Sequence, residues 1–109
     1  MTDLPTRKEG FLRDPLPRRL GNLASSLNRI ALIPTSTGRA AMVDECKHFI
    51  EWTAADTEPE TAEELVEIQR QLPRFEDKLE QPDQLQTLKN RAKEWSNRVL
   101  QHSGLLEEK

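Results

Sequence analysis

The sequence predicts an all-α fold, an antiparallel up-and-down four-helix bundle preceded by an extended amino-terminal tail. Large apolar residues recur at steps of three and four in four separate segments, which places each set on one stripe of a helix. Pro34, Gly38 and Pro82 fall between these segments, and the expected loops are short, so neighbouring helices are expected to be antiparallel. We expect a basic, mobile or extended tail at residues 1–14, one helical domain at 15–106 and a charged tail at 107–109. The alternative for the tail is that its apolar pair, Phe11 and Leu12, docks on the bundle.

The first helix is expected from Pro15 to about Ile33. Asp14 is placed as its N-cap, and a proline at the first helical position is favoured because its missing N–H would have no helical partner. Pro34 ends the helix, since a proline disfavours the helical conformation of the residue before it. The apolar stripe consists of Leu16, Leu20, Leu23, Leu27 and Ile30.

The second helix is expected to follow a loop at 35–38 and to reach about Ala54. Its stripe is the least apolar of the four, with Val43 and Ile50 only beside it, and consists of Met42, Cys46, Phe49 and Thr53. A thin stripe buries little surface, so the alternative architecture is a pair of helical hairpins that completes its core as a homodimer.

The third helix is expected over residues 57–80. Thr57 and Glu60 have the spacing of a capping box, which marks its start. Its apolar stripe runs through Pro73 without losing phase, so Pro73 predicts a kink and not an end. The stripe consists of Leu65, Ile68, Leu72, Phe75 and Leu79.

The fourth helix is expected to begin with Gln81 as N-cap and Pro82 as the first helical residue. Gly104 suits a left-handed conformation just after its end. The apolar stripe consists of Leu85, Leu88, Ala92, Trp95 and Val99.

Length and composition narrow the class of protein. The chain has 109 residues, of which 35% are hydrophobic and 32% charged, so it fits one domain with a modest core. No apolar run approaches the length of about 20 residues that a membrane-spanning helix needs. Residues 1–5 lack the pattern of a secretory signal, and a single cysteine agrees with a reducing compartment. We therefore expect a cytoplasmic protein.

Two patterns in the sequence are candidates for chemistry. Glu45 and His48 have the E-x-x-H spacing of carboxylate-bridged metal sites, but the other histidine, His102, has Val99 where a carboxylate is needed. Cys46 lies on a predicted apolar stripe, where a cysteine behaves as a small hydrophobe. No phosphate-binding loop or nucleophile motif occurs in the sequence. The sequence therefore predicts no catalytic residue, no metal, no cofactor and no enzymatic activity.

The acidic residues gather between positions 56 and 67, where six carboxylates occur without a basic residue. The pattern lacks the glycine and alternating oxygen ligands of an EF-hand. Two interpretations remain: the carboxylates complement the dipole of a helix start, or they form a docking surface for a basic partner.

The basic residues are concentrated near the amino terminus. Residues 1–39 carry seven basic and three acidic side chains, whereas residues 40–109 carry nine basic and sixteen acidic ones. We expect a non-enzymatic protein that acts by protein–protein contact, as an adaptor, assembly factor or regulatory subunit, through this arm or an exposed helix face. The alternative is a nucleic-acid-associated accessory protein that uses the same arm. The candidate partner-binding residues are Arg7, Lys8, Arg13, Arg18, Arg19 and Trp52.

Overall fold

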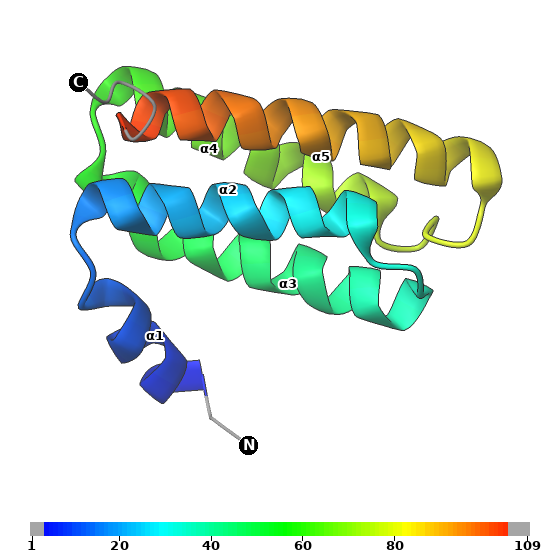
Figure 1. Cartoon of the computed structure of the whole chain (residues 1–109), viewed down its shortest axis with the longest axis horizontal. Helices are drawn as coiled ribbons and strands as arrows, with labels where there is room; N and C mark the ends of the chain where they lie inside the picture. Colours follow the sequence, from blue (N-terminus) through cyan, green and yellow to red (C-terminus); the bar gives the residue numbers. More distant parts are fainter. Residues whose placement is uncertain (1–3, 105–109) are drawn as a thin grey trace.

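The computed structural model describes residues 4–104, and every regular element within them is helical (Figure 1). The predicted all-α class is therefore confirmed. The elements in chain order are α1 (Leu4–Leu12), α2 (Leu16–Leu32), α3 (Ser36–Thr53), the 3₁₀ turn η1 (Ala54–Asp56), α4 (Pro59–Gln71), the 3₁₀ turn η2 (Leu72–Phe75) and α5 (Pro82–Ser103). The predicted charged tail at 107–109 lies outside the described residues.

Helices α2, α3, α4 and α5 run in alternate directions and enclose one apolar core (Figure 1). The most extensive packing joins α2 to α5, with small residues at the contact. The Ser96 hydroxyl of α5 donates a hydrogen bond to the backbone oxygen of Ala24 at 2.7 Å, which brings the two helix backbones close together. Among residues 4–104, each helix is too short or too polar to cross a lipid bilayer.

The amino-terminal segment differs from the prediction. Residues 4–12 form helix α1, so the expectation of an extended tail is wrong there. The physical reason is Phe11, which is 7% exposed and contacts the rings of Phe49 and Trp52 of α3. An apolar partner on α3 compensates the cost of ordering this short helix.

The start of α2 lies one residue later than predicted. Pro15 occupies the N-cap position, and Leu16 is the first helical residue. The Asp14 carboxylate is not a cap, because it accepts a hydrogen bond from the Asn22 side chain at 3.3 Å.

The inward face of α3 also differs from the predicted stripe. Val43, Cys46, Ile50 and Thr53 are buried, whereas Met42 and Phe49 are only partly buried. The buried set has the same steps of three and four, but it is rotated so that two β-branched aliphatic side chains reach the core. Phe49 is thereby left free to contact α1.

The predicted helix over 57–80 is wrong in its start and in its extent. The Thr57 hydroxyl donates to the backbone oxygen of Ala54 at 2.8 Å, so no capping box forms, and Pro59 begins α4. The α-helix ends at Gln71 because Pro73 has no N–H to continue it. Leu72, Phe75 and Leu79 are still buried, although they reach the core from η2 and the turns after it.

The last helix agrees with the prediction. Gln81 is the N-cap, Pro82 is the first helical residue, and Gly104 has a φ of 80° in the left-handed region. Leu88, Ala92, Trp95 and Val99 are buried, while Leu85 is partly buried.

Candidate functional site: an acidic groove along helix α4

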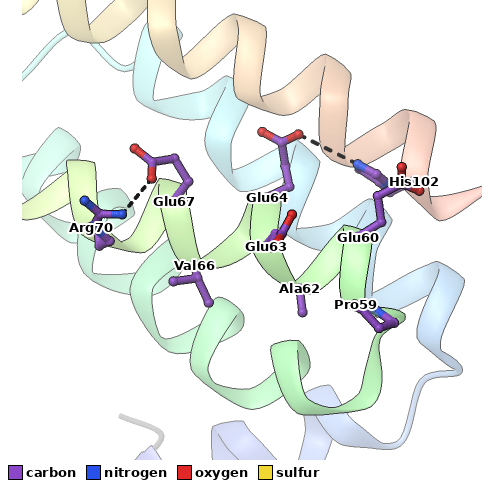
Figure 2. Close-up of a pocket in the computed structure, with 9 residues that line it drawn as sticks. All are labelled: Pro59, Glu60, Ala62, Glu63, Glu64, Val66, Glu67, Arg70 and His102. Atoms are coloured by element: carbon purple, nitrogen blue, oxygen red, sulfur yellow. Dashed lines mark hydrogen bonds and ion pairs between the residues drawn. The ribbon is translucent and has the colours of Figure 1, made fainter.

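A groove of about 730 Å³ follows the outer side of α4 and ends at the last turn of α5 (Figure 2). Eight of the nine residues that line it come from α4, and His102 comes from α5. We call it the acidic groove. Its lining consists of Pro59, Glu60, Ala62, Glu63, Glu64, Val66, Glu67, Arg70 and His102.

Burial of one side of α4 fixes the rotation of the helix, and with it the position of the groove on the other side. Leu65 and Ile68 are fully buried, so the helix cannot rotate without exposing them. Positions 60, 63 and 67 follow at steps of three and four on the other side, where their carboxylates face solvent. The local sequence therefore fixes one apolar and one acidic face on the same helix.

The four carboxylates of the groove are not equivalent. Glu67 accepts from Arg70 at 3.0 Å and from the Gln71 amide at 2.8 Å. Glu64 lies 3.4 Å from an Arg98 nitrogen, across the interface with α5. Glu60 and Glu63 are exposed and have no hydrogen-bond or ion-pair partner among residues 4–104. The last two carboxylates are available to a ligand.

Apolar side chains line the side of the groove opposite to that on which Glu64 and Glu67 project (Figure 2). Val66 is 50% exposed, although it stands one position from the buried Leu65. It lines the groove with Ala62, which is partly buried and one turn earlier (Figure 2). A surface that combines free carboxylates with exposed aliphatic carbon suits a cationic side chain on an apolar stem, such as lysine or arginine.

Thr61, His102 and Glu64 meet at one end of the groove in an order that resembles a nucleophile, a base and an acid. The Thr61 hydroxyl oxygen lies 3.0 Å from Nδ1 of His102, within hydrogen-bond distance. Nε2 of His102 lies 3.8 Å from a Glu64 oxygen, which is too long for the hydrogen bond that would orient a catalytic imidazole. Thr61 is also buried. The three side chains therefore connect the start of α4 to the end of α5.

The predicted basic residues are distributed between internal contacts and solvent. Arg19 is buried and pairs with Asp56 at 3.0 Å. Arg7 lies 3.5 Å from Glu45, and Arg13 lies 3.9 Å from Glu9. Lys8 and Arg18 are exposed. Three of these cations thus have carboxylate partners within the chain, and their role in binding stays a prediction.

Trp52, the aromatic residue among the predicted contacts, is only partly buried. Its ring lies 5.8 Å from that of Phe11 and 6.1 Å from that of Phe49, measured between centroids. The His48 ring stacks on the Trp52 ring with centroids 5.4 Å apart. Trp52 therefore belongs to the contact between α1 and α3.

Glu45 and His48, the candidates for metal binding, take part in other contacts, and Cys46, the candidate for thiol chemistry, is buried. Glu45 accepts a hydrogen bond from Ser26 at 2.7 Å, and His48 lies 3.5 Å from Asp44 and from Glu51. Within residues 4–104, no three His, Cys, Asp or Glu side chains are grouped as metal ligands would be. Burial, and secondarily the charge of Glu45, raises the pKa of the Cys46 thiol well above its usual range. A thiol held protonated in this way is a poor nucleophile.

Comparison with protein-family models, with curated proteins and with solved structures found no match for this chain. The site therefore has to be interpreted from its own residues. Sequence reasoning identified the acidic run but missed Val66 and His102. Val66 could have been found as an apolar residue next to the predicted stripe and between carboxylates, whereas nothing in the sequence places His102 beside α4.

Proposed function

We propose that this chain is a non-enzymatic helical protein that works by binding another protein, and that the acidic groove receives a basic segment of that partner. The observation that carries the proposal is the pair of carboxylates Glu60 and Glu63, which have no partner among residues 4–104 and line one groove with the half-exposed Val66. Carboxylates and exposed aliphatic carbon in one groove give an interface charge specificity together with some apolar burial.

Nucleic acid is the less favoured partner. The acidic groove would repel phosphates, and three of the predicted basic residues, Arg7, Arg13 and Arg19, have carboxylate partners within the chain. The chain as a whole has a net charge of −3. These charges support a basic protein segment over a nucleic acid.

For the scaffold we propose an antiparallel up-and-down four-helix bundle of α2, α3, α4 and α5. Its support is the alternating direction of these helices and the burial of Val43 and Ile50, which makes α3 a full contributor to one core (Figure 1). This lowers the need for a homodimer that completes the core. We propose the cytoplasm as the compartment, on the ground that a single buried cysteine suits reducing conditions.

The experiment is co-purification of the tagged full-length chain from its own cells at low and moderate salt. The test variant is Glu60→Lys with Glu63→Lys. The matched control is Asp77→Lys with Asp83→Lys, which makes the same change in net charge at exposed positions outside the acidic groove. We expect a protein partner that is retained by the wild type and the control and is reduced at least tenfold by the test variant.

Two results would contradict the proposal. Equal retention by the test variant would mean that the acidic groove does not bind the partner. Nucleic acid that co-purifies at low salt and is released at moderate salt would favour the accessory-protein alternative.

A further inference from the structure

Helix α1 is attached to the rest of the protein through very few side chains. Figure 1 shows α1 at an angle to α2 and α3, projecting away from the other helices. Phe11 is its only buried residue, and its ring stacks on Phe49 with centroids 4.2 Å apart and planes 14° from parallel. Leu4 and Leu12, its other large apolar residues, are 41% and 39% exposed. Phe11 is therefore the apolar anchor of this contact.

A charged contact lies one helical turn before this anchor. Arg7 approaches Glu45 of α3 at 3.5 Å, and the other oxygen of Glu45 accepts a hydrogen bond from Ser26 of α2 at 2.7 Å. Ser26 holds the carboxylate in position for a cation. Arg7 and Phe11 are four residues apart, so both side chains point from the same side of α1.

We infer that Ser26, Glu45, Phe49 and Trp52 form a helix-binding site that recognises a cation four residues before an aromatic residue. In this structure α1 is the tethered occupant. A helix of the same pattern in another protein displaces it. This site is separate from the acidic groove and does not depend on it.

The segment that joins α1 to α2 is attached to α2 at Asp14, which accepts hydrogen bonds from Arg19 at 3.1 Å and from Asn22 at 3.3 Å, so release of α1 involves the residues before Asp14. Residues 13–15 connect the two helices, and Pro15 favours extended backbone at Asp14. The backbone hydrogen bonds that close this turn, from Arg13 to Gly10 and from Asp14 to Phe11, are both 3.3 Å long. A terminal helix with one buried side chain opens more readily than the core helices.

Helix α1 also leaves part of the site unfilled. A cavity of about 190 Å³ lies against Phe49 and Glu45 and is further lined by Asn22, Ser25, Ser26 and Arg29. Its wall is polar apart from Phe49. A displacing helix with a longer polar side chain next to its aromatic residue would gain contacts there that α1 does not make.

The test measures binding of a fluorescently labelled peptide with the sequence of residues 4–14 to the full-length chain by anisotropy. Phe11→Ala in the chain removes the anchor of α1 and leaves the site empty more often. We expect this variant to bind the peptide at least tenfold more tightly than the wild type, whose own α1 competes. Phe49→Ala added to Phe11→Ala should abolish the binding.

Matched peptides test the recognition pattern. A peptide with Phe11→Ala, and one with Arg7→Glu, should each bind the Phe11→Ala chain at least tenfold more weakly than the original peptide. A chain with Arg7→Glu keeps Phe11 and offers a second way to weaken the docking of α1. It should fall between the wild type and Phe11→Ala in affinity for the original peptide.

Circular dichroism should confirm that each chain remains helical before binding is measured. Equal affinity of the wild type and the Phe11→Ala chain would overturn the inference, as would no binding by a folded Phe11→Ala chain. Dimers of the wild type that disappear in Phe11→Ala would identify the occupant as α1 of a second copy, and would overturn its assignment to another protein.

Discussion

At the scale of single residues, Arg18 and Arg19 are neighbours in sequence with different environments. The Arg19 side chain is 11% exposed, pairs with Asp56 at 3.0 Å and donates to the backbone oxygen of Asp14 at 3.1 Å. We expect Arg19→Ala to lower the free energy of unfolding by about 1–2 kcal/mol, because it removes a largely buried side chain and the donor to the Asp14 backbone oxygen, whereas water can solvate Asp56, which is 55% exposed. Urea denaturation measures this change.

Arg18→Ala is the matched control for this prediction. Arg18 is exposed, so its removal should change the free energy of unfolding by less than about 0.5 kcal/mol. If the two variants lose equal stability, the ion pair of Arg19 contributes nothing specific. A larger loss of stability for Arg19→Ala than for Arg18→Ala would show that Arg19, one of the predicted partner-binding residues, has a structural role.

Cys46 predicts how stability depends on alkaline pH. Its thiol pKa is raised in the folded state by burial and by Glu45, whereas an unfolded thiol has a pKa of about 8.5. Above that pH the unfolded chain loses a proton that the folded chain keeps. The free energy of unfolding should then fall by about 1.4 kcal/mol per pH unit from this group, and it should be unaffected below.

Cys46→Ala provides the comparison. The cavity it leaves lowers stability at every pH, but the difference from the wild type should shrink as the pH rises from 8 to 10. Denaturation curves at several pH values measure the two slopes. Parallel slopes would contradict the prediction and would mean that the thiol ionises equally in both states.

At the scale of the elements, the apolar pattern predicted which residues are buried better than it predicted the shape of the backbone. Leu65, Ile68, Leu72, Phe75 and Leu79 are all buried, yet only the first two belong to α4. Period alone cannot distinguish a kinked helix from a helix that ends in a 3₁₀ turn, because both keep side chains on the same side for one more turn.

The faces of α1 and α3 were mispredicted for a related reason. The α3 sequence offers two overlapping stripes, and the choice between them depends on the neighbouring helices. Phe49 packs at the edge of the core, where Phe11 covers it, and this contact spans 38 positions in the chain. Local spacing carries no information about a contact of that range, so α1 was expected to be an extended tail.

The start of α3 provides a prediction for one element. The Gly38 N–H donates to the Thr35 hydroxyl at 3.0 Å, and a Cβ at position 38 would lie 2.5 Å from Cγ2 of Ile33 and 2.9 Å from that hydroxyl. We expect Gly38→Ala to lower the free energy of unfolding by about 1–3 kcal/mol, because the crowding outweighs the better helix propensity of alanine. Thermal denaturation measures the loss.

Gly10→Ala is the control for Gly38→Ala. Gly10 lies within helix α1, and a Cβ there would have no atom within 4 Å. Its helix propensity should therefore be the main change, worth up to about 1 kcal/mol in favour of α1. If Gly38→Ala is as harmless as Gly10→Ala, the contact with Ile33 must relax without cost.

At the scale of the whole molecule, one apolar core determines where a surface is left for binding. Its buried side chains come from α2, α3, α4, η2 and α5, so each of these helices has only its outer side free. On α4 that side carries the acidic groove. The sequence could predict that a helix with this stripe has an acidic outer face, but the contribution of His102 depends on how α5 ends beside α4.

A single core also predicts cooperative unfolding of α2 to α5. Trp95 is 4% exposed at the centre of the apolar cluster and reports on the core, whereas Trp52 reports on the site under α1. In a Trp52→Phe chain, the fluorescence of Trp95 and the far-ultraviolet circular dichroism should give urea transitions with the same midpoint, as expected for a two-state domain of this size. Helix α1, with nine residues, should contribute only a small early loss of helical signal.

A large loss of helix before the change in Trp95 fluorescence would mean that α4, which carries the acidic groove, melts separately. The proposed binding surface would then fold only with its partner.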